Sequence, residues 1–141
     1  MKNPKIPESK IPKNWQELVS LKDYLSVCGC DNLRFHDHQI FYLNYQKLFS
    51  KEIRHKIIFK TIGKNDFKIL RNAFPYNRLT KNLGNIGHYC LWSKKGPISE
   101  IEIESLIKDK FKNKDYFWFE NSPKTKSIPE IWHCQIFVNE N

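Results

Sequence analysis

The spacing of apolar positions changes about halfway along this chain of 141 residues. In the first half, apolar residues recur every three to four positions, as on the buried face of a helix. From Phe67 onward they alternate with polar residues in short runs between turn residues, which indicates strands. The pattern predicts helices over Trp15–Cys28, from about Asp37 to Phe49, over Lys51–Gly63 and over Ser99–Phe111. It predicts strands over Phe67–Arg71, His88–Lys94, Tyr116–Asn121 and Ile131–Val138.

Two of the predicted helices begin with capping signals. Asn14 precedes the first helix with Glu17 three positions later, and Ser50 precedes the third. Gly63 ends that third helix. Its inward face is predicted to hold Ile53, Ile57, Ile58 and Ile62. The segment Lys56–Ile62 is dense in β-branched residues, so a strand is the alternative there.

Helices first and strands later are typical of an α+β domain with an antiparallel sheet. We predict an N-terminal helical half packed on such a sheet, with the Ser99–Phe111 helix as its one crossover connection. Prolines among lysines in residues 1–13 predict an extended basic arm, and residues 14–141 a single α+β domain. The basic, Asn- and Gly-rich segment Asn77–Gly87 is predicted to be a loop.

Composition narrows the class of protein. An apolar share of 40% and an aromatic share of 14% fit a folded domain rather than a disordered chain. No apolar run approaches the roughly 20 residues of a membrane helix. The first residues lack the apolar segment of a secretory signal. We therefore expect a cytoplasmic protein with no membrane partner.

The net charge of +9 comes from 24 Lys+Arg against 15 Asp+Glu and has two interpretations. A solvated, lysine-rich surface accounts for it, and so does attraction to the phosphates of a nucleotide or a nucleic acid. The basic residues are mostly lysines scattered among acids, with no dense arginine block. A nucleic-acid interface would use the arm and the segment Arg78–Lys81.

Cys28 and Cys30, followed by His36 and His38, have the residue types of a zinc site. Their C-x-C and H-x-H spacings do not match a common structural zinc motif. A turn after the first helix, with Gly29 as its C-terminal signal, explains the same residues. Without a signal peptide, reduced thiols are expected. The sequence implies no cofactor.

The last third of the chain carries the candidate chemistry. His133 and Gln135 alternate with large apolar residues on one predicted strand, so their side chains share a face. A strand this apolar seldom buries two hydrogen-bonding groups without a partner. His88 lies on a second predicted strand. The structural alternatives are a half-exposed strand histidine for His88 and, for His133, a core histidine satisfied by a backbone carbonyl.

The order of parts from Ile69 to Val138 resembles the histidine-triad (HIT) superfamily of nucleotide hydrolases and transferases. The shared parts are a strand entering a proline-containing loop, a strand that begins with histidine, a helix, a strand ending in asparagine, and a histidine strand. They correspond here to Ile69–Tyr76, His88–Lys94, Ser99–Phe111, Tyr116–Asn121 and Ile131–Gln135. The family's His-x-His-x-His is here Ile131-x-His133-x-Gln135, which is similar to the branch of nucleotidyl transferases and dinucleoside phosphorylases that ends in glutamine.

This resemblance implies a HIT-like sheet and a pocket for a nucleotide or a nucleotide sugar. His133 would be the nucleophile that takes the nucleotidyl group, with His88 as the second catalytic residue. Gln135 would hold a phosphate oxygen, and Phe74 and Tyr76 lie where the fold packs a nucleoside. The remaining candidate ligand-binding residues are Asn121 and Ser127.

The whole chain more closely resembles an uncharacterised family that includes fungal N-acetylglucosamine-induced proteins. The similarity rests on Trp15–Val19, Asn72–Tyr76, Ile86–Ser93 and Lys126–His133. Family members typically read Asn-Asp-Phe-Pro-Tyr and His-x-His-Val where this chain has Ala73 and Gln135. Because no activity is established for that family, this resemblance implies relatives rather than a reaction.

Three functions are therefore open from the sequence. The first is a HIT-like domain that binds a nucleotide or nucleotide sugar and transfers or hydrolyses a nucleotidyl group through His133. The second is a non-catalytic ligand- or protein-binding module, because Ile131 replaces a histidine of the motif. The third is a basic nucleic-acid-binding domain.

Overall fold

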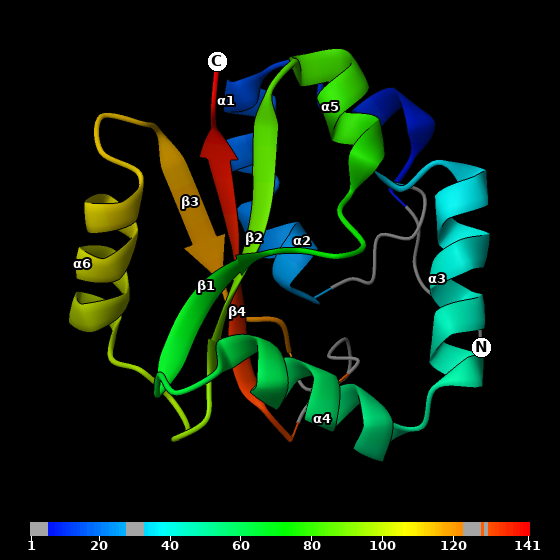
Figure 1. Cartoon of the computed structure of the whole chain (residues 1–141). Helices are drawn as coiled ribbons and strands as arrows, with labels where there is room; N and C mark the ends of the chain where they lie inside the picture. Colours follow the sequence, from blue (N-terminus) through cyan, green and yellow to red (C-terminus); the bar gives the residue numbers. More distant parts are fainter. Residues whose placement is uncertain (1–5, 28–32, 123–127, 129) are drawn as a thin grey trace.

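Four strands form one antiparallel sheet at the centre of the molecule (Figure 1). The computed structural model describes residues 6–27, 33–122, 128 and 130–141. The strands are β1 (Phe67–Arg71), β2 (Ile86–Ser93), β3 (Tyr116–Phe119) and β4 (Trp132–Asn139), in the spatial order β1-β2-β4-β3. The predicted α+β class with an antiparallel sheet is confirmed.

β2 pairs along its whole length with β4, so the two histidine strands are neighbours. His88 lies opposite Phe137, and His133 lies opposite Trp92. Because β2 and β3 both run antiparallel to β4, they are parallel to each other. Helix α6 (Glu100–Lys110) makes the connection between them, as predicted for the crossover helix.

The other helices in the described part of the chain are α1 (Trp15–Ser20), α2 (Lys22–Val27), α3 (His36–Leu48), α4 (Lys51–Ile62) and α5 (Asn77–Leu83). The predicted caps are present. The Asn14 side chain accepts from the Glu17 backbone N–H at 2.9 Å, and the Ser50 hydroxyl accepts from the Ile53 N–H at 3.3 Å. Gly63 follows α4 with a φ of 71°, a conformation that favours glycine. The helix, not the alternative strand, occupies residues 56–62.

Two predictions about the helices are wrong. The first helix is divided at Leu21, whose backbone N–H bonds to Leu18 three residues back and so closes a tight turn. The predicted loop Asn77–Gly87 contains α5, because Leu79 is only 1% exposed and anchors that helix in the core. The described end of the predicted N-terminal arm is also packed on the domain. Within it, Ile6 and Ile11 are buried.

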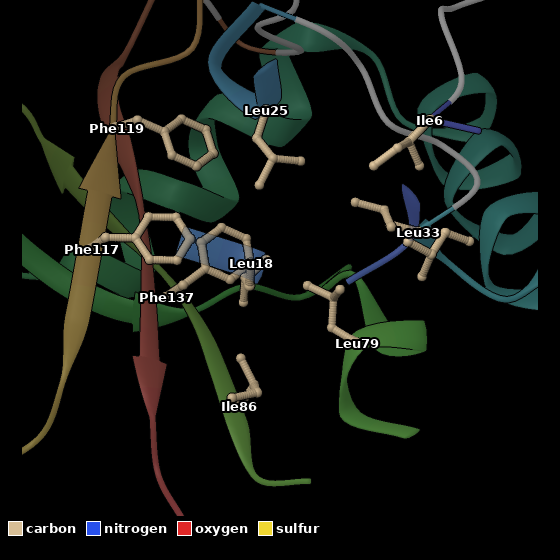
Figure 2. Close-up of a cluster of buried hydrophobic side chains, with 10 residues drawn as sticks. Ile6, Leu18, Leu25, Leu33, Leu79, Ile86, Phe117, Phe119 and Phe137 are labelled. Carbon is tan, nitrogen blue, oxygen red and sulfur yellow. The ribbon is translucent and has the colours of Figure 1, made fainter. Parts of the chain in front are cut away.

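Helices cover both faces of the sheet (Figure 1). One core lies between the sheet and α6. The second lies on the opposite face, where three phenylalanines of β3 and β4 meet residues from α1, α2 and α5 (Figure 2). These phenylalanines stack on one another with ring centroids 5.2 to 6.3 Å apart; they are Phe117, Phe119 and Phe137. This aromatic layer sets the distance between the sheet and the N-terminal helices.

Helices α3 and α4 do not pack on either core. Ile62 is buried at 1% exposure, but Ile53 is 45% and Ile57 43% exposed, contrary to the predicted inward face of α4. Phe41 of α3 is 66% exposed. The two helices instead lie on the side of the sheet away from α6 (Figure 1). None of the helices in the described segments is long and apolar enough to cross a membrane.

We predict that Trp15→Ala lowers the free energy of unfolding by about 2 kcal/mol, less than a fully buried tryptophan would cost. The indole is half-buried and contacts Phe117, with ring centroids 5.6 Å apart. The fully buried Leu18→Ala should cost about 3 kcal/mol in the same urea titration. Exposed Gln16→Ala is the control on the same helix. A cost for Trp15→Ala no larger than the control's would contradict the packing.

Candidate functional site

A cavity of about 360 Å³ lies on the face of the sheet opposite α6. Even-numbered residues of β2 and odd-numbered residues of β4 point to this face because side chains alternate along a strand. The segment after β1 and helices α3 and α4 supply the other walls. Six of the predicted site residues line this one cavity: Phe74, Tyr76, His88, Asn121, His133 and Gln135. The seventh, Ser127, lies outside the described residues.

His88 uses both ring nitrogens inside the protein. The Tyr76 backbone N–H donates to Nδ1 at 3.2 Å, and Nε2 lies 2.7 Å from Gln135 Oε1. The ring stacks on Phe137 with centroids 4.2 Å apart. Burial, together with the positive charge of Arg34, lowers the pKa of His88 to about 3. His88 is therefore a neutral residue that joins the Phe74–Tyr76 segment to β4.

These contacts determine which end of the Gln135 side-chain amide accepts and which end can donate. A backbone N–H can only donate, so His88 Nδ1 accepts and the proton of the neutral ring is on Nε2. That N–H must donate to Gln135 Oε1, which also receives the Asn72 side-chain amide at 3.4 Å. The carbonyl end of Gln135 is thus occupied. Its NH₂ group is the end that can donate to a ligand.

His133 is oriented by the backbone. Its Nδ1 lies 2.9 Å from the carbonyl oxygen of Ile131, which can only accept, so Nδ1 carries a proton and Nε2 is the nitrogen that bears the lone pair in the neutral form of the ring. The ring stacks on Trp92 with centroids 4.2 Å apart. His133 is thus both a lining residue of the cavity and a histidine satisfied by a backbone carbonyl.

Aromatic rings gather on the side of the cavity formed by α3. Tyr42 and Tyr45 each lie 4.9 Å from the Phe74 ring. Asn72 holds this segment by accepting from the Phe74 backbone N–H at 2.8 Å, the geometry of an Asx turn. The Arg34 guanidinium donates to the Phe74 carbonyl and lies over the rings of Tyr42 and Tyr76.

The charge of the cavity was not predicted from the sequence. Three arginines line it, Arg34, Arg54 and Arg71, and none of its described lining residues is an aspartate or glutamate. Arg71 has a carboxylate partner, Glu140, at 3.7 Å. A spacing signal existed for Arg54, because it lies three and four positions before Ile57 and Ile58, which line the same cavity.

The remaining candidates are the cysteines, the predicted zinc ligands and the predicted nucleic-acid segment. Burial raises the pKa of the Cys90 thiol, so this cavity residue is not a thiolate at neutral pH. No group of three or more potential metal ligands occurs among the described residues. His36 and His38 are exposed at the start of α3, whereas Cys28 and Cys30 lie outside the described segments. In the predicted nucleic-acid segment, Arg78 pairs with Glu8 at 3.0 Å.

The His88 pKa predicts a pH dependence of stability. An unfolded histidine takes up its proton near pH 6.5, whereas folded His88 stays neutral down to about pH 3. Between these values the unfolded state binds more protons, so stability falls as pH falls. From pH 6.5 to 4.5 the wild type should lose about 2 kcal/mol more than His88→Gln in urea unfolding. Carboxylates titrate equally in both proteins; identical pH dependences would contradict the neutral buried ring.

The comparisons with known proteins agree with this architecture. A solved structure titled "Crystal Structure of HTC1" is similar, with a TM-score of 0.58 and 15% identity over 89% of this chain and 84% of that chain. At this identity the likeness concerns the fold alone. No curated protein matches the chain significantly. A family model described as "Protein of unknown function (DUF3605)" matches residues 30–139. Since the match spans most of the chain, the protein belongs to the uncharacterised DUF3605 family.

Proposed function

We propose that the cavity binds a phosphorylated small molecule, a nucleotide or a nucleotide sugar. The observation that carries this proposal is the composition of its walls. Arginines, His133 and the Gln135 NH₂ group supply donors and positive charge, and no described lining residue is acidic. Aromatic rings form another wall. A ligand with an anionic part and a flat ring matches both.

The size of the cavity fits this class of ligand. A volume of about 360 Å³ is within the range of small-molecule sites. The cluster of Tyr42, Tyr45 and Phe74 would offer ring faces and edges to a nucleobase. Arg34, which lies over Tyr42 and Tyr76, brings positive charge to that wall.

We further propose that His133 transfers the nucleotidyl group. The lone pair on Nε2 attacks the phosphorus atom, an N–P bond forms, and the P–O bond to the leaving group breaks. Water then attacks the phosphorus atom and the N–P bond breaks, so the electron pair of that bond returns to Nε2. The proton that water loses passes to the leaving group of the first step or to solvent. The Gln135 NH₂ and the arginines would stabilise the charge on the phosphoryl oxygens. The HIT resemblance of the Ile131–Gln135 strand supports this role.

A second candidate is a binding module without catalysis. Ile131 occupies the position of the first histidine in the HIT motif and contributes only its backbone carbonyl to His133. His88 is fully engaged in structural hydrogen bonds. In that case the same cavity binds the same class of ligand and releases it unchanged.

We predict that His133→Asn abolishes turnover while changing ligand affinity less than about threefold, because only the covalent step needs the imidazole. The protein is incubated with nucleotides, dinucleoside polyphosphates and nucleotide sugars, the products are separated by chromatography, and binding is measured by calorimetry. His38→Asn is the control, since His38 is exposed on α3 and outside the cavity. Binding without turnover by the wild type favours the second candidate. No binding of any ligand would refute the proposed function.

Gln135→Glu should weaken ligand binding about 10-fold or more, whereas Gln135→Ala should weaken it only about threefold. The glutamate keeps the acceptor for His88 Nε2 but replaces the donating NH₂ by a negative charge. The two variants are compared by calorimetry at constant ionic strength. Equal affinities for both would show that the amide does not face the anionic part of the ligand. Binding that falls steeply with added salt would point to nucleic acid instead.

A further inference from the structure

Arg54 of α4 is the one buried charged residue in the described structure whose side chain leaves a nitrogen unsatisfied. The residue is 8% exposed, and its Nε is buried without a hydrogen-bond partner among the described residues. It lines the cavity described above. Buried polar groups are nearly always paired, so an exception of this kind requires an explanation.

The chemistry of the guanidinium restricts the explanation. A buried lysine or histidine can lose its proton and become neutral, but arginine remains charged in proteins. Its charge has to be stabilised by acceptor oxygens, by ring faces as for Arg34, or by an anion, and no acceptor among the described residues reaches its Nε. Glu130 contacts α4 but pairs with Lys51 Nζ at 3.3 Å and His55 Nε2 at 3.2 Å rather than with Arg54. The counter-charge of Arg54 is therefore missing from the described protein.

The position of Arg54 shows where that anion would lie. Arg54 lines the cavity from α4, whereas the aromatic cluster around Phe74 belongs to α3 and the segment after β1. Figure 1 shows α3 and α4 as two separate helices. Ile57 and Ile58 of α4 also line the cavity, so the Arg54 side chain, which is 8% exposed, lies beside apolar side chains. In such surroundings a charge-assisted hydrogen bond from Arg54 is stronger than it would be in water.

We propose that Arg54 binds an oxyanion of the ligand, a phosphate or a carboxylate group, and that α4 carries the anion subsite of the cavity. This inference places the anionic group within the proposed function, but it also holds for an anionic ligand that is not a nucleotide. The empty protein keeps an uncompensated buried charge, so it is less stable than it would be with an apolar residue at this position. The ligand relieves that cost when it binds.

The test uses the full chain and two variants of Arg54. Thermal unfolding and calorimetry are performed at constant ionic strength with inorganic phosphate, pyrophosphate or malonate in place of chloride. Arg54→Met removes the charge, and Arg54→Lys keeps a charge but cannot donate two parallel hydrogen bonds to one oxyanion, as a guanidinium can. Lys56→Met is the matched control, because Lys56 is exposed on the same helix, lies outside the cavity, and its loss changes net charge equally.

Pyrophosphate or phosphate should raise the melting temperature of the wild type and of Lys56→Met but not of Arg54→Met. The dissociation constant should rise about 100-fold in Arg54→Met and about 10-fold in Arg54→Lys. In chloride alone, Arg54→Met should melt about 4 °C higher than the wild type. A response to malonate but not to phosphate would assign the subsite to carboxylates rather than phosphates, with the same dependence on Arg54.

Two outcomes would overturn the inference. One is equal affinity of the wild type and Arg54→Met for the anions; the other is a wild type that responds to none of them. If Arg54→Met does not fold, unchanged affinity in Arg54→Lys and in Arg54→Gln has the same consequence. Nucleotides that bind equally to the wild type and Arg54→Met would leave the proposed function standing without this subsite. Pyrophosphate binding that depends on Arg54, without nucleotide binding, would refute the proposed function and keep the subsite.

Discussion

The site depends on the pairing of β2 with β4. This ladder runs from Ile86 opposite Asn139 to Ser93 opposite Trp132, and it sets which side chains of each strand reach the cavity. A register shifted by one residue would turn His133 and Gln135 toward α6 and bring Cys134 and Ile136 to the cavity instead. Apolar contacts on both faces of these strands hold the register, because a slip would bury the polar side chains against α6. The hydrophobic packing and the polar site are thus specified by the same pairing.

The hydrogen bonds around His88 determine which polar groups of the cavity donate and which accept. The Tyr76 N–H donates to His88, and His88 in turn donates to Gln135. This follows because one nitrogen of a neutral imidazole accepts a hydrogen bond and the other donates one. The result is a cavity lined by donors, positive charge and aromatic rings. Such a cavity has little that would attract a cation and much that would attract an anion.

The parts that could be predicted from the sequence were those decided by local patterns. Alternation placed His133 and Gln135 on one face, and Asn14, Ser50 and Gly63 marked helix ends through their own chemistry. The division of the first helix at Leu21 and the helix over Asn77–Leu83 depend on what the rest of the chain packs against them, which no local pattern encodes. Membership of an uncharacterised family was also expected. Arg54 was missed because a charged residue on a helix normally faces solvent; its spacing from Ile57 and Ile58 indicated a shared side of α4, and the tertiary structure shows that Arg54 is buried there.

The contact between His133 and the Ile131 carbonyl has an evolutionary consequence. A side chain that orients a histidine can be lost by a single substitution, but a backbone carbonyl is present whatever residue occupies the position. Position 131 is buried, so selection there acts on size and apolarity rather than on hydrogen bonding. Valine or leucine in place of Ile131 would leave the tautomer of His133 unchanged. The orientation of this ring therefore does not depend on which apolar side chain occupies position 131.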